Sequence, residues 1–173
     1  SEFVDIVLNN ESANNTYMVA NNRNIDNPSF APILKDVDYD DQVLDPKRWK
    51  GCTAFWLGPE GTVTPNHHDT CNILFVQIYG RKRFRMYSPL DVELLNGARS
   101  MYAAIDPEAP DLKTHPNFAD VAERSVILEP GDAIFLPIGW WHHVRSLDIS
   151  ISLAMTNFRV SNQFDWFRPG EVD

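Results

Sequence analysis

The chain has 173 residues, a length that fits one domain with a buried core. Hydrophobic residues make up 43% of it and aromatic residues 12%, which excludes a wholly disordered chain. The formal net charge of −9 disfavours nucleic acid as a partner, because the phosphate backbone is also negative.

The cysteine content and the length of the apolar runs indicate the cellular compartment of the protein and whether it associates with a membrane. The sequence has two cysteines, Cys52 and Cys71, which are too few for a disulfide framework and predict a reducing, cytoplasmic setting. No apolar run approaches the ~20 residues of a membrane helix, so no membrane association is predicted. The start, Ser-Glu-Phe, is typical of a cloning remnant, and we expect the chain to be a fragment of a longer protein.

In chain order, the first fifty residues predict a short helix over 4–9, a short strand over 16–20 and a long polar loop. Short strands separated by turn residues follow from residue 52. The first is 53–58; the next two, 72–79 and 83–88, are predicted to form a hairpin with Gly80 at its turn.

Residues 88–124 are predicted to be irregular or weakly helical. The stretch "SVILEPGDAIFLP" then predicts two strands around a Pro-Gly turn. Apolar and small residues alternate in "DISISLAMTNF", the pattern of a half-buried strand.

Many short strands with little helix predict a mainly β domain, a sandwich or a jelly roll. We expect a single domain over 1–173, in which 1–50 is an N-terminal flanking segment, 51–160 the jelly-roll core and 161–173 a C-terminal tail.

Four of the five histidines occur in two doublets, "NHHDT" and "WWHHV". On an extended strand His67 and Asp69 leave from the same face and His68 from the other. Two imidazoles and one carboxylate form the facial triad of non-heme Fe(II) oxygenases. The residues alone also allow a polar loop at 67–69, a satisfied core histidine in the second doublet, or either His142 or His143 as third ligand.

Two longer segments, "LGPEGTVTPNHHDTCNILFVQIYGRKRFRMYSP" and "LEPGDAIFLPIGWWHHVRSLDISISLAMTNF", resemble the cupin-like branch of the JmjC-domain oxygenases, which use Fe(II) and 2-oxoglutarate. The resemblance covers about residues 16–158. It implies a double-stranded β-helix with the metal at its open end. It also implies His67, Asp69 and His142 as metal ligands.

The same resemblance implies a binding site for 2-oxoglutarate. Lys82 matches the buried lysine that pairs with the far carboxylate, and Thr64 and Tyr17 match residues that help to hold it. Asn157 matches an asparagine that lines the cosubstrate pocket. Without the resemblance, the residues favour an exposed turn lysine in "GRKR" and leave Asn157 open as a strand-end residue that meets solvent.

The chain departs from the protein-hydroxylase pattern at Ile73, where that pattern has an asparagine. Asn72 is adjacent, but strand alternation turns it to the other face unless a bulge intervenes. Trp140, Trp141 and Phe135 are predicted to form an apolar wall that excludes water from the site, although core packing explains them equally well.

The resemblance implies an oxygenase that uses Fe(II), 2-oxoglutarate and O₂ to hydroxylate a C–H bond, with a protein or peptide side chain as the expected substrate. The alternatives are a tRNA-base or small-molecule hydroxylase, an N-methyl-lysine demethylase, and a non-catalytic metal-binding cupin module. A pure binding module has no need of Lys82. A homodimer is possible, but the tail at 161–173 does not support it, because it is short for the dimerisation helices of some family members.

Overall fold

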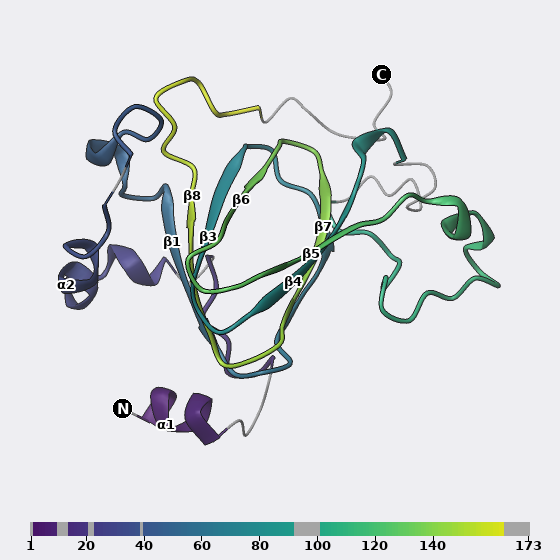
Figure 1. Cartoon of the computed structure of the whole chain (residues 1–173), viewed down its shortest axis with the longest axis horizontal. Coiled ribbons are helices and arrows are strands. Elements are labelled where there is room, and N and C mark those ends of the chain that lie inside the picture. Colours follow the sequence, from purple (N-terminus) through teal and green to yellow (C-terminus); the bar gives the residue numbers. More distant parts are fainter. Residues whose placement is uncertain (1, 10–13, 21–22, 39, 92–100, 165–173) are drawn as a thin grey trace.

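A computed structural model describes residues 2–9, 14–20, 23–38, 40–91 and 101–164. Their strands form two four-stranded sheets that face each other across the core (Figure 1). The first sheet has the order β1 (Thr53–Gly58), β8 (Ser150–Met155), β3 (Ile73–Tyr79) and β6 (Ala133–Leu136). The second has the order β2 (Val63–His67), β7 (Trp141–Ser146), β4 (Lys82–Tyr87) and β5 (Arg124–Leu128).

The fold is the predicted jelly roll, a double-stranded β-helix. All neighbouring strands are antiparallel, and the chain crosses between the two sheets at every connection except that from β4 to β5. Apolar side chains from both sheets fill the space between them and form the core, namely Phe75, Phe84, Leu128, Leu136, Val144 and Ala154.

The predicted hairpin of 72–79 with 83–88 is wrong. β3 pairs with β8 and β6, whereas β4 pairs with β7 and β5 in the other sheet. Gly80 lies at the crossing with φ +66°, and a Cβ there would lie 2.0 Å from the carbonyl oxygen of Ile149. The alternating pattern predicted both strands and the turn, but it carries no information on whether a short turn joins partners or changes sheets.

Apolar side chains between residues 18 and 37 pack against the outer face of the first sheet. The N-terminal segment to which they belong contains α1 (Glu2–Asn9), which includes the predicted helix, α2 (Ala31–Leu34), and 3-10 helices at Asn24–Asp26, Pro28–Phe30 and Pro46–Arg48. The strand expected over 16–20 is reduced to a single bridge between Met18 and Leu57.

Strand β8 is mostly buried on both faces rather than half-buried as expected. Its apolar residues face outward, where Leu153 packs with Ile25 and Phe55 beneath the N-terminal segment. Its small residues, including Ala154, face the space between the sheets. The predicted alternation along this strand is therefore confirmed, but its apolar side chains point out of the barrel.

Residues 101–123 cover the outer face of the second sheet, where Tyr87 and Trp141 pack against Ala103, Phe118 and Val121. As expected, the described part of 88–124 is irregular apart from 3-10 helices at Pro89–Asp91 and Pro116–Asp120. In Figure 1 this segment projects on the side of β5 and β7, opposite α2. Within the described ranges, no helix has the length and apolarity needed to cross a bilayer.

Candidate metal and cosubstrate site

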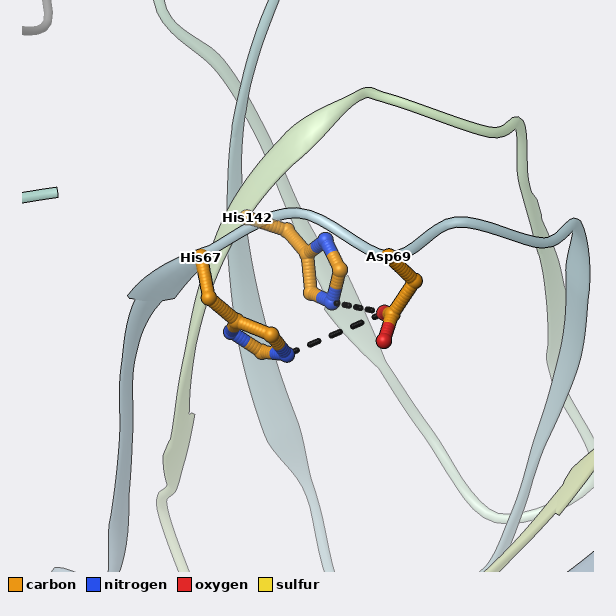
Figure 2. Close-up of side chains that lie close together, drawn as sticks. All are labelled: His67, Asp69 and His142. Atoms are coloured by element: carbon orange, nitrogen blue, oxygen red, sulfur yellow. Dashed lines mark ion pairs between the residues drawn. The ribbon is translucent and has the colours of Figure 1, made fainter. Parts of the chain in front are cut away.

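Three side chains converge at one end of the barrel (Figure 2). His67 ends β2 and lies opposite His142 on β7, with 4.2 Å between the two ring centroids. Asp69 follows β2, and its Oδ2 lies 3.5 Å from Nε2 of His142 and 3.8 Å from Nε2 of His67. The three potential ligand atoms all lie within 4.8 Å of one another, so one ion could contact all of them.

Backbone carbonyls orient both imidazoles. Nδ1 of His67 lies 2.8 Å from the carbonyl oxygen of Pro65, and Nδ1 of His142 lies 3.0 Å from that of Trp140. Because a carbonyl only accepts hydrogen bonds, each Nδ1 carries the hydrogen and each Nε2 keeps a lone pair directed at the centre of the group.

Burial governs the charges in this group. It lowers the pKa of His142 to about 3, so this imidazole stays neutral, which is the form that binds metals. Burial also raises the pKa of Asp69, against the opposing effect of His67 and His68. A divalent cation would supply the missing positive charge beside this carboxylate.

The other member of each doublet lies on the opposite face of the sheet, as strand alternation predicts. His68 is buried, and its ring meets the ring of Trp141 edge-on with 4.8 Å between centroids. His143 is also buried and lies near Asp106 and Glu108. The structure thus brings His142, not His143, beside Asp69.

Lys82, the first residue of β4, lies inside the barrel with only 1% of its surface exposed. Its Nζ donates a hydrogen bond to the Tyr17 hydroxyl at 3.1 Å and lies 5.3–5.6 Å from the ring centroids of Tyr17, Trp56 and Phe75. No acid in the described residues forms an ion pair with it, and burial lowers its pKa to about 7.

Tyr17 and Thr64 lie with Lys82. The Tyr17 side chain forms hydrogen bonds with the side chains of Thr64 and Thr62, and burial raises its pKa to about 12. Tyr17 is therefore a neutral phenol at physiological pH and can donate a hydrogen bond to an anion. The three residues offer an ammonium and two hydroxyls in one place.

One cavity of about 810 Å³ joins the metal-type group to Lys82. Its volume lies in the range of about 300–1,000 Å³ that is usual for small-molecule sites. His67, Asp69 and His142 line it together with Tyr17, Thr64 and Lys82, and its apolar walls include Trp56, Phe75, Phe84, Leu136 and Val144.

The predicted wall of Trp140, Trp141 and Phe135 is wrong, since none of these residues lines the cavity. Trp141 is fully buried on the outer face of the second sheet, and Phe135 is 51% exposed. Each alternates with a neighbour that does line the cavity, His142 and Leu136, and therefore faces the other way.

Asn157 is not brought into this cavity either. It is buried, and its Nδ2 donates to the carbonyl oxygen of Asp45 at 2.8 Å, which attaches the N-terminal segment to the end of β8. Because Asn157 continues the apolar phase of β8, it faces outward with Met155. Thr156, on the opposite phase, lines the cavity.

The departure at Ile73 leaves an apolar side chain in the cavity wall. Asn72 does not replace the missing amide, because its own side chain is engaged elsewhere. Its Oδ1 accepts from the backbone N–H of Ile138 at 2.9 Å, and its Nδ2 donates to Oδ1 of Asn162 at 2.9 Å. Asn72 thus holds the loop before β7.

The sequence analysis missed several residues of the cavity. Tyr102 stacks on His67 with 5.7 Å between ring centroids and 28° between planes, is 53% exposed and lines the cavity beside the metal-type group. Tyr102 lies in an irregular segment, where no helix or strand periodicity in the sequence could predict the direction of its side chain. Cys52 and Cys71 also line the cavity and form no disulfide.

Comparisons with known proteins agree with the fold. A family model described as "Cupin-like domain" matches residues 1–164. The chain is 39% identical over 103 residues to lysine-specific demethylase 8 of Xenopus tropicalis. The aligned stretch covers 57% of this chain and 23% of that protein. It is 39% identical over 108 residues to Jumonji C domain-containing protein 5 of Drosophila melanogaster. That aligned stretch covers 57% of this chain and 26% of the Drosophila protein.

A third relative is HSPB1-associated protein 1 of Homo sapiens, 34% identical over 130 residues, or 70% of this chain and 26% of that protein. The chain therefore spans about a quarter of the length of the curated relatives that it matches.

Proposed function

Since the chain belongs to the cupin-like domain family and has JmjC-domain relatives, we propose that it is an Fe(II)- and 2-oxoglutarate-dependent oxygenase that hydroxylates a C–H bond on a protein or peptide side chain. One observation carries the proposal: the group of His67, Asp69 and His142 shares a cavity with a buried lysine that has no acidic partner among the described residues.

In the proposed site, His67, Asp69 and His142 would hold Fe(II), and the cavity that they line would give the cosubstrate access to it. When bound there, Fe(II) with 2-oxoglutarate and O₂ supplies the oxidising power to convert C–H to C–OH, while the cosubstrate becomes succinate and CO₂. The hydrogen bonds to Pro65 and Trp140 keep both imidazoles in the metal-binding tautomer.

Lys82 gives the cavity its preference for a dicarboxylate. A buried ammonium is costly without a counter-charge, and the far carboxylate of 2-oxoglutarate supplies one. Tyr17 and Thr64 add hydroxyl donors at the same point. The apolar walls exclude water, which strengthens the contact between ammonium and carboxylate.

A second candidate, N-methyl-lysine demethylation, is favoured by the name of the demethylase relative from Xenopus tropicalis. The chemistry is the same up to the product, because hydroxylation of an N-methyl group gives a carbinolamine that releases formaldehyde. The non-catalytic alternative gives no role to Lys82.

Product analysis tests the proposal. The chain would be incubated with Fe(II), 2-oxoglutarate, O₂ and a peptide library that includes methylated lysines. We expect succinate together with a gain of one oxygen on a peptide; formaldehyde release would instead indicate the demethylase. Asp69→Ala should lose both signals, and His115→Ala, which changes a histidine outside the site, should keep them. Succinate no higher in the wild type than in Asp69→Ala would contradict the proposal.

A further inference from the structure

A second group of metal-type donors lies on the outer face of the second sheet. Asp106, Glu108 and His143 place potential ligand atoms within 4.8 Å of one another. His143 is the residue after His142 on β7 and is only 3% exposed, while both acids belong to the segment that covers this face. We propose that these three residues bind a divalent transition-metal ion of the Zn²⁺ type.

A buried amide on the same face of the β2–β7 pair supports the proposal. Asn66 is 2% exposed, and neither its Oδ1 nor its Nδ2 has a hydrogen-bond partner in the part of the chain that the structure describes. Asn66 precedes His67 and His143 follows His142, so the pairing of His67 with His142 puts Asn66 and His143 on the same outer face. Unsatisfied buried polar atoms of this kind indicate a bound ion or water.

The covering segment reaches this face through a defined contact. The backbone N–H of Ala103 donates to the carbonyl oxygen of Asn66 at 2.9 Å and thereby ties the segment to β2 three residues before Asp106. This contact places the covering segment over the face that carries Asn66 and His143.

The charge balance also favours a cation. Asp106 and Glu108 carry two negative charges, and one of them is offset by Arg145, whose Nε lies 2.7 Å from both oxygens of Glu108. One negative charge remains beside the buried imidazole of His143.

The donor types select the class of metal. An imidazole with carboxylates suits Zn²⁺ and its neighbours, whereas Ca²⁺ and Mg²⁺ prefer oxygen alone. An ion here would fasten residues 106–108 to β7, one residue from His142. The expected role is structural, because the site faces away from the cavity.

Metal stoichiometry tests this inference independently of the proposed enzyme. The chain would be dialysed against Zn²⁺, and bound zinc would be measured by mass spectrometry. We expect two ions per chain in the wild type and one in each of His67→Ala, His143→Ala and Asp106→Asn. Combining His67→Ala with His143→Ala should leave none. The matched control His115→Ala should keep two.

The inference is overturned if the His143→Ala and Asp106→Asn chains bind as many ions as the wild type. Failure of the inner site alone would look different: the wild type would bind one ion, which His143→Ala removes and His67→Ala does not. Asp106 is exposed, so its replacement should spare the fold. As a second readout, zinc should raise the melting temperature of the His67→Ala chain, and adding Asp106→Asn should remove that rise.

Discussion

The two faces of the β2–β7 pair carry similar donors in different surroundings. The inner group has two imidazoles and one carboxylate and opens into the cavity. The outer group has one imidazole and two carboxylates, and Arg145 occupies one of those carboxylates. On β7 the two groups are one residue apart, at His142 and His143, whereas the outer carboxylates come from the segment that covers this face. The ligand atoms of the inner group are open to the cavity. In the outer group, the charge of Glu108 is already paired with Arg145.

The largest effect is expected from substitutions that remove a ligand of the inner group and leave the outer group intact. With Fe(II) and 2-oxoglutarate in the absence of O₂, the wild type should show a weak metal-to-ligand charge-transfer band in the visible spectrum. His67→Ala and Asp69→Ala should each abolish it, because each removes a ligand. His68→Ala should retain it, since that ring packs on Trp141. A band that depends on His68 and not on His67 would refute the assignment of faces.

The next effect is a pH dependence set by Lys82, whose pKa burial lowers to about 7. Above pH 7 the ligand-free lysine is neutral, so binding of dianionic 2-oxoglutarate must take up one proton. The affinity should then fall by up to about tenfold per pH unit above 7. Calorimetry on the Mn²⁺-loaded chain measures both affinity and proton uptake. In Lys82→Met the affinity should be weak and flat with pH, whereas Lys113→Met should behave as the wild type does.

The same lowered pKa affects folding in a defined direction. Between pH 7 and the ordinary lysine value of about 10.4, the unfolded chain binds more protons at this site than the folded chain does. The contribution of Lys82 to the free energy of unfolding should therefore rise with pH across that window. The Lys82→Met chain should lack this component in denaturant titrations, and an equal pH slope in both chains would contradict the buried placement.

A smaller effect sharpens the contrast with the outer group. Arg145→Gln frees both oxygens of Glu108 and removes a positive charge, so the outer site should bind Zn²⁺ about tenfold more tightly. The inner site should be unchanged. Zinc titration of the His67→Ala chain with and without Arg145→Gln isolates the effect, and weaker binding would show that Arg145 supports the site instead of competing with it.

The smallest expected effect concerns Asn157. Replacing it with Ala removes the hydrogen bond to Asp45 and should lower the free energy of unfolding by about 1 kcal/mol. The affinity for 2-oxoglutarate should stay the same, because Asn157 does not line the cavity. A tenfold loss of that affinity with normal stability would restore the role that the resemblance implies.

Strand alternation alone predicted which histidine of the first doublet joins Asp69. It could not predict that Lys82 is buried, because "GRKR" at a turn favours exposure; that expectation came from the resemblance. Alternation also identified two faces of β8 but could not say which lies inside. The small side of β8 faces the cavity, where Ala154 and the following Thr156 form part of the wall.

The contribution of the loops could not be predicted for a different reason. Tyr102 stacks on His67, and Asp106 and Glu108 lie beside His143, yet all three belong to a segment without helical or strand period. Their positions depend on tertiary contacts such as the hydrogen bond from Ala103 to Asn66. Periodicity reports on local structure and is silent about such contacts.

The central claim is that the inner group and Lys82 bind the two ends of one molecule. The most direct test compares the affinity of the anaerobic Fe(II)-loaded chain for 2-oxoglutarate and for 2-oxopentanoate, which has the same chelating end but no far carboxylate. At pH 7 we expect the wild type to prefer 2-oxoglutarate by roughly 30-fold or more, because only this ligand forms the buried ion pair with Lys82, and we expect Lys82→Met to lose this preference. Equal affinities in the wild type would contradict the account.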